Sequence, residues 1–111
     1  MSAPVLSPAA AGLLRGLIAR SGARRSDVLL TDVRSVGWRS LTFDGERHDI
    51  SMRFTGPDAA LEADRMVAGM EDHEFSLNGA IVADINVLGR CVGLGDGSVS
   101  LAIEALTISS D

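Results

Sequence analysis

The chain of 111 residues contains no lysine, no glutamine and no tyrosine, and its only cysteine is Cys91. A single cysteine excludes an intramolecular disulfide and any metal site built from several thiolates. Because disulfides are excluded, we expect a reducing, cytoplasmic environment. No apolar run approaches the roughly 20 residues that span a bilayer, so we expect no membrane-spanning segment.

Aromatic residues are also scarce, and they are limited to Trp38, Phe43, Phe54 and Phe75. The core must therefore consist mainly of aliphatic residues and methionine, and we expect no platform on which nucleic-acid bases stack. The net charge is −5, and all ten basic residues are arginine. An acidic chain is poorly suited to binding nucleic-acid phosphates. The arginine bias is typical of a GC-rich genome, so we expect a bacterial source.

The charges are unevenly distributed along the chain. Residues 1–26 contain Arg15, Arg20, Arg24 and Arg25 but no acidic residue. One interpretation is a helix whose cations lie near its C-terminal end, where they interact favourably with the helix dipole. The other is a regulator whose first helix binds an anionic surface, which predicts salt-dependent binding to lipid or nucleic acid.

The first helix is predicted by capping residues and by apolar spacing. Ser7 is a suitable cap, Pro8 suits the first helical position, and Gly22 suits the end. Residues that recur at helical spacing give this helix one apolar face, which consists of Ala10, Leu13, Leu14, Leu17, Ile18 and Ser21.

A second helix is predicted after Pro57 and Asp58, which suit its first turn. Glu62 and Arg65 lie one turn apart, and we expect both on the solvent-exposed side. The opposite side is apolar and is expected to be buried, with the stripe Ala59, Ala63, Met66, Val67 and Met70.

Two Asp-Gly dipeptides, at residues 44–45 and 96–97, each lie between two runs of β-type alternation. Asp-Gly is a strong signal for a hairpin turn, so the sequence predicts two β-hairpins, each following a helix. In the first hairpin we expect Trp38 opposite Ile50 on the core face. The alternative is that Trp38 anchors a partner, because tryptophan is enriched at the centres of interfaces.

Alternation in the second hairpin predicts that Ile81 and Ile85 face the core and that Val82 and Asp84 face away from it. The outward face of the sheet is then partly apolar, which is unusual for a solvated face. We therefore expect this face to contact another protein. The candidate interface consists of Val82, Asp84, Leu106 and Ile108.

The expected fold is α+β: a single domain over residues 1–111, with an antiparallel sheet from two β-hairpins and two helices on one face, in the order α-β-β-α-β-β. In size, acidic charge and element order the chain resembles secretion-type chaperones. Those proteins act as dimers that hold a segment of a partner. The chain lacks their closing C-terminal helix, so the resemblance assigns no role to any residue.

A candidate ligand site combines Glu46, His48 and His73. The first two are two apart on a strand, so they share a face and offer two metal ligands. His73 lies in the acidic cluster Glu71–Glu74, whose carboxylates suit a divalent cation. The alternative is that these polar residues are simply solvated. A third metal ligand is not evident, so we expect no metal and no cofactor.

Glycines alternate with other residues over residues 89–97, a pattern that suggests a phosphate-binding loop. Such a loop must lead into a helix N-terminus, and here a strand follows, so we expect a hairpin tip. Cys91 lacks a positioned base and is expected to be a small apolar residue, not a nucleophile.

No catalytic constellation emerges, so the sequence predicts a non-enzymatic protein-interaction domain. We expect a homodimer that forms through the open sheet face or an edge strand, with no nucleic-acid or membrane partner. The final strand, which carries Leu106 and Ile108, is the expected edge. The alternative is a small ligand- or metal-binding protein or enzyme that uses Glu46, His48 and the Glu71–Glu74 cluster.

Overall fold

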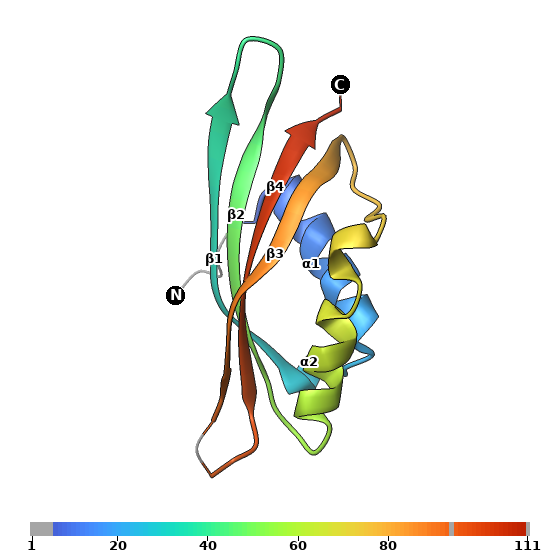
Figure 1. The fold of residues 1–111 in the computed structure, drawn as a ribbon, viewed down its shortest axis with the longest axis vertical. Coiled ribbons are helices and arrows are strands. Elements are labelled where there is room, and N and C mark those ends of the chain that lie inside the picture. The colour runs from blue at the N-terminus through green and yellow to red at the C-terminus, as the bar shows by residue number, and fades with distance from the viewer. Residues whose placement is uncertain (1–5, 94, 111) are drawn as a thin grey trace.

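The computed structural model describes residues 6–93 and 95–110. Both helices lie on the same side of one four-stranded antiparallel sheet (Figure 1). The predicted α+β class and element order are confirmed. The elements are α1 (Pro8–Ser21), η1 (Arg25–Asp27), β1 (Val28–Arg39), β2 (Asp44–Phe54), α2 (Ala59–Val67), η2 (Met70–Asp72), β3 (Ala80–Val92) and β4 (Val99–Ser109).

Helix α1 begins and ends where the sequence predicts. Ser7 Oγ accepts a hydrogen bond from Ala10 N at 3.1 Å, and Gly22 ends the helix in the left-handed conformation with a φ of 68°. Residues on one side of the predicted apolar face are fully buried, whereas Leu14 and Ile18 are only partly buried. The apolar face of α1 is therefore wider than the surface that it covers.

The strands are ordered β1-β2-β4-β3 in the sheet. Strand β4 lies between β2 and β3, so the prediction that the final strand is an edge is wrong. The edges are β1 and β3. The physical reason is the regular alternation of β4, whose inward side chains are all buried and pair on both sides, with Ile103 opposite Ile50 of β2 and opposite Val87 of β3.

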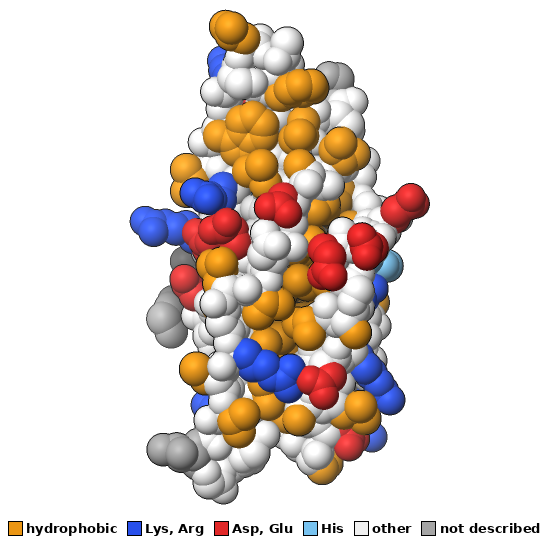
Figure 2. All heavy atoms as spheres, in the orientation of Figure 1, with side chains coloured by type: hydrophobic (Ala, Val, Ile, Leu, Met, Phe, Trp, Pro, Cys, Tyr) orange, Lys and Arg blue, Asp and Glu red, His pale blue; other side chains and the backbone are white. Residues whose placement is uncertain are grey.

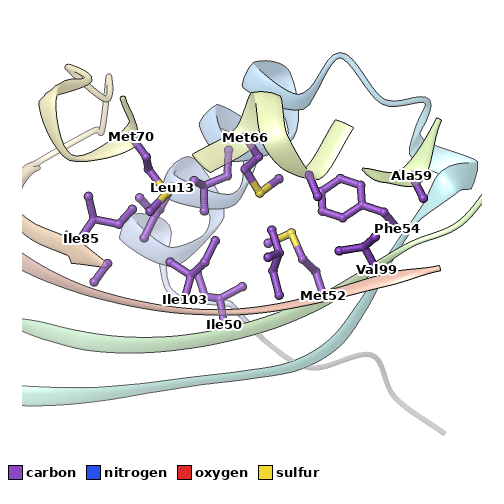
Figure 3. Close-up of a cluster of buried hydrophobic side chains, with 14 residues drawn as sticks. Leu13, Ile50, Met52, Phe54, Ala59, Met66, Met70, Ile85, Val99 and Ile103 are labelled. Atoms are coloured by element: carbon purple, nitrogen blue, oxygen red, sulfur yellow. The ribbon is translucent and has the colours of Figure 1, made fainter. Parts of the chain in front are cut away.

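The core lies between the two helices and the inward side chains of β2 and β4 (Figure 3). Met52 and Phe54 of β2 lie against Met66 of α2 and Leu13 of α1, and all four side chains have no exposed surface. Apart from Phe54, the fully buried hydrophobic side chains are aliphatic residues and methionines, as the composition requires.

The first hairpin does not turn at its Asp-Gly dipeptide. The chain turns earlier, where Ser40 N donates to Phe43 O at 2.7 Å, and Gly45 lies inside β2. The register pairs Trp38 with Gly45, so the predicted pairing of Trp38 with Ile50 on the core face is wrong. The cause is the turn: Arg39 pairs with Asp44 across residues 40–43, and the register then runs without a shift to Asp32, so Trp38 lies opposite Gly45 on the face away from the core. The second Asp-Gly dipeptide lies in the loop between β3 and β4, as predicted.

A bulge changes the expected faces of β3. The register shifts between Val82 and Asp84, so Ile81 pairs with Ile108 and is 55% exposed, while Val82 pairs with Thr107 and packs against the core. The prediction that Val82 faces away from the core is therefore wrong. One extra residue in β3 reverses the inward and outward positions on its two sides.

Glu62 is buried, contrary to the prediction that it lies on the exposed side of α2. The residue is only 7% exposed, and its Oε1 has no hydrogen-bond partner among the described residues. Burial raises the pKa of this carboxyl, and the nearby Asp27 and Asp58 raise the pKa further. The buried face of the short helix α2 is wider than its apolar stripe, and it includes Glu62 at its edge.

We expect Glu62→Gln to stabilise the protein by about 1 kcal/mol at pH 7, because an amide avoids burying an unpaired carboxylate. A carboxyl with a raised folded-state pKa stabilises the fold when protonated, and this stability is lost as the pH rises from about 4.5 through the folded-state pKa. The advantage of the amide should therefore disappear in acid. Thermal unfolding midpoints of the wild type and Glu62→Gln across this pH range test the prediction, with the exposed Glu74→Gln as the control. An unchanged midpoint of Glu62→Gln at neutral pH would contradict it.

Candidate functional site

The helices leave one face of the sheet uncovered, and we call it the open face (Figure 1). The register places Trp38, Gly45, Ile108 and Ile81 in one row across all four strands of this face. The next row contains outward-pointing hydrophobic residues as well, and the adjoining turn adds Phe43, which is 57% exposed. We call this set the apolar patch, and it consists of Val36, Trp38, Phe43, Ile81, Leu106 and Ile108.

The apolar patch lies at the end of the molecule where β1 turns into β2 and β4 ends. Figure 2 shows hydrophobic side chains gathered at this end, with acidic and arginine side chains in a band next to them. Leu106 and Ile108 are partly buried, whereas Val36 is 53% exposed. Large apolar side chains in a continuous row on an uncovered face are typical of a contact surface.

Three of the four predicted interface residues lie on the open face: Asp84, Leu106 and Ile108. Val82 lies on the other face, as described above. Sequence reasoning missed Ile81 and Val36. A bulge after Val82 places Ile81 on the open face, and the turn at residues 40–43 places Val36 there; neither feature has a clear local signal. It offered Trp38 as a partner anchor only as the alternative, and Trp38 lies on the open face.

Charges of both signs border the apolar patch. On the open face, Arg47 forms a 3.4 Å ion pair with Glu104 at the inner end of the patch. Arg39 and Asp44 pair in register with each other next to Trp38 and Gly45, so they point to the opposite face of the sheet. Asp84 lies in the same row as Arg47. Since both partners of the ion pair are partly exposed, it contributes little stability by itself. The border is therefore mixed in charge and repels neither sign.

The indole N–H of Trp38 lacks a hydrogen-bond acceptor. Its Nε1 is covered, yet it has no hydrogen-bond acceptor within the part of the chain that the structure describes. A covered donor without an acceptor costs about 1–3 kcal/mol. Such a side chain at the surface gains a hydrogen bond if it reorients against a partner, which favours a contact role over a purely structural one.

The predicted ligand residue His48 is completely buried within a polar chain of contacts. Its Nδ1 lies 2.8 Å from Ser35 Oγ, and its Nε2 lies 2.9 Å from Thr107 Oγ1. Thr107 donates its hydroxyl proton to Glu46 O at 3.3 Å, so Nε2–H donates to Thr107 and Nδ1 accepts from Ser35. Both ring nitrogens are occupied, so neither is available for a metal.

The structure does not bring the predicted ligand residues together. His73 is exposed, and its ring lies edge-on to Phe75 with centroids 4.6 Å apart. The cavity beside His73, of about 580 Å³, shares no lining residue with the cavity of about 610 Å³ beside Glu46. Among the described residues, no three histidine, cysteine or acidic side chains are arranged to hold a metal ion.

Burial lowers the pKa of His48 below 6.5, against the opposing effects of Glu46 and Asp49. The unfolded chain then binds a proton more readily than the folded one, so we expect stability to fall as the pH drops below about 6.5 and to level off below the folded-state pKa. Urea unfolding at a series of pH values measures this. His48→Gln should remove that part of the pH dependence, whereas His73→Gln should retain it; identical profiles for the two variants would contradict the assignment.

The glycine-rich segment forms a hairpin tip. Asp96 accepts hydrogen bonds from Ser98 N at 2.9 Å and Ser98 Oγ at 2.8 Å, which lower the pKa of its carboxyl. Arg53 adds an ion pair to Asp96 at 2.6 Å. Strand β4 follows the tip, and Cys91 is exposed near the end of β3. The segment therefore lacks the helix N-terminus that a phosphate-binding loop requires.

Neither helix in residues 6–93 and 95–110 is long and apolar enough to cross a membrane. No family model, curated protein or solved structure matches the chain.

Proposed function

We propose that this protein is an interaction domain that forms a homodimer by packing the apolar patches of two open faces together. The observation that supports this proposal is the apolar row of Trp38, Ile108 and Ile81 on a face that no described element covers. Burying such side chains against a partner releases about 25 cal/mol for each Å² of apolar surface.

A second copy of the chain is the partner that suits this surface best. In a two-fold dimer the same patch contacts itself, so the patch must be self-complementary. An apolar patch meets this condition. The border meets it too, because Arg47 and Asp84 carry opposite charges in the row at its inner end. A copy turned by 180° therefore meets charges of both signs.

The size of the apolar patch limits the strength of the dimer. Four strands about 4.8 Å apart are about 19 Å wide, and the five residues from Phe43 to Arg47 span about 17 Å along a strand. The patch thus covers about 300 Å², less than half of the ~800 Å² per partner of a standard interface. We therefore expect a dimer that dissociates in the micromolar range.

Light scattering from low to high micromolar concentration tests the dimer. We expect the mass to rise toward twice that of the chain, and Ile81→Asp to hold it at the monomer value, because a carboxylate in the contact would be desolvated without a partner. Leu88→Asp is the matched control, since Leu88 is a 60% exposed residue of the same strand outside the patch. A monomer at high micromolar concentration, or equal effects of the two variants, would rule out this proposal.

A further inference from the structure

A groove runs between α1 and the first part of β1, on the helix side of the sheet. Leu30 of β1 pairs with the buried Met52, yet it is 37% exposed, because the helices do not extend over this edge. Two cavities of about 580 and 240 Å³ occupy the space, and they share lining residues along its length. The shared residues are Leu6, Leu14, Ile18 and Arg25.

The groove is lined mainly by apolar side chains, with one arginine in its narrower part and two in its wider part. The narrower cavity is lined by Val28, Leu30 and Met52, together with the shared residues. The wider cavity adds Arg15, so two guanidinium groups border it. None of the residues that line either cavity is acidic. An apolar slot with cations at its open part is complementary to a molecule with an apolar tail and an anionic head.

The two arginines differ from Arg20, their neighbour on the chain, in what they contact. Arg20 donates to the carbonyl groups of Met66 and Ala68 and thereby ties α1 to the end of α2. Arg15 and Arg25 take part in no ion pair between described residues. A carboxylate that reached them would gain charge-assisted hydrogen bonds, and would meet no acidic side chain among the lining residues.

We propose that this groove binds a single-chain amphiphile with an anionic headgroup, of the class of long-chain fatty acids. The hydrocarbon chain lies in the narrower cavity between Ile18 and Leu30, and the carboxylate lies in the wider cavity between Arg15 and Arg25. The larger cavity volume, about 580 Å³, falls within the ~300–1,000 Å³ of small-molecule sites. The groove lies on the helix side of the sheet, away from the apolar patch, so this proposal stands independently of the dimer.

Calorimetric titration of the intact protein with monomeric palmitate tests the groove. We expect one palmitate per chain, and binding at least tenfold weaker for hexadecanol, which has the same tail without the charge. This comparison uses the unaltered protein, so it does not depend on the folding of a variant. No heat with palmitate, or equal affinity for hexadecanol, would overturn the proposal.

Substitutions then locate the site. The double variant Arg15→Glu, Arg25→Glu should weaken palmitate binding at least tenfold, and Leu30→Asp should do the same by placing a charge in the narrower cavity. Arg34→Glu on the open face is the control and should leave the affinity unchanged. Circular dichroism confirms that each variant is folded. Unchanged affinity in the folded double variant, or binding to anionic vesicles without binding to monomeric palmitate, would place the ligand elsewhere and overturn the groove assignment.

Discussion

Met66→Asp is expected to abolish folding. The Met66 side chain has no exposed surface and lies among Met52, Phe54 and Leu13, where helices and sheet meet (Figure 3). The substitution removes about 2–5 kcal/mol of apolar packing and buries an unpaired carboxylate, which costs several kcal/mol more. Domains of this size are stable by only about 5–15 kcal/mol, so little or no folded protein should remain at 25 °C.

Leu61→Asp provides the matched control for this prediction. Leu61 lies on the same helix but is 46% exposed, so an aspartate there remains solvated and should change stability by less than about 1 kcal/mol. Circular dichroism during thermal unfolding compares the two variants. A cooperative transition of Met66→Asp at the wild-type temperature would show that α2 does not pack on the sheet in the way described.

The helices and the fold class could be predicted because their signals are local. Ser7 and Gly22 mark the ends of α1 by their own chemistry, whatever the rest of the chain does. The buried stripe of α2 follows from residue spacing alone, and Ala63 and Met66 are buried as expected. Glu62 departs from this rule, because the width of the buried face depends on how α2 is seated, which spacing does not determine.

The strand faces could not be predicted where an extra residue interrupts the alternation. Each side chain of a strand changes face when one residue is inserted, so a single bulge near Val82 moved Ile81 to the open face. The bulge is stabilised by pairing with β4, which is distant in sequence from the start of β3. In β1 the feature that could not be predicted is the turn: it covers residues 40–43 and pairs Arg39 with Asp44, which places Trp38 outside the core.

For the candidate ligand site, too, local features could be predicted and long-range contacts could not. Sequence spacing correctly placed Glu46 and His48 on one face. The hydrogen-bond partners of His48, however, are Ser35 and Thr107, which come from the strands on either side of β2. Only the sheet order β1-β2-β4-β3 brings these residues together. A buried histidine whose two ring nitrogens are hydrogen-bonded to hydroxyl groups cannot serve as a metal ligand. The sequence could not distinguish the two roles, because the strand order decides which residues surround His48.

Gly45 shows most directly why the Asp-Gly signal misled. Its dipeptide was expected to supply a turn, where glycine is needed for its backbone freedom. In the structure Gly45 lies within β2, and its φ is not in the left-handed region. The requirement is instead for space. A Cβ at this position would overlap the carbonyl oxygen of Thr107 and come within 2.8 Å of its carbonyl carbon.

Gly45→Ala should therefore destabilise the protein by about 3 kcal/mol, because β2 must move away from β4 to accept one methyl group. Gly89→Ala is the matched control, since Gly89 also lies in a strand but a Cβ there meets nothing within 4 Å. Urea unfolding compares the two variants. Because Gly45 lies in the row between Trp38 and Ile108, the displaced strand should also separate the apolar patch and weaken the dimer. If the two alanine variants were equally stable, β2 and β4 would not approach as closely as this register requires, and the apolar patch would lose its geometric basis.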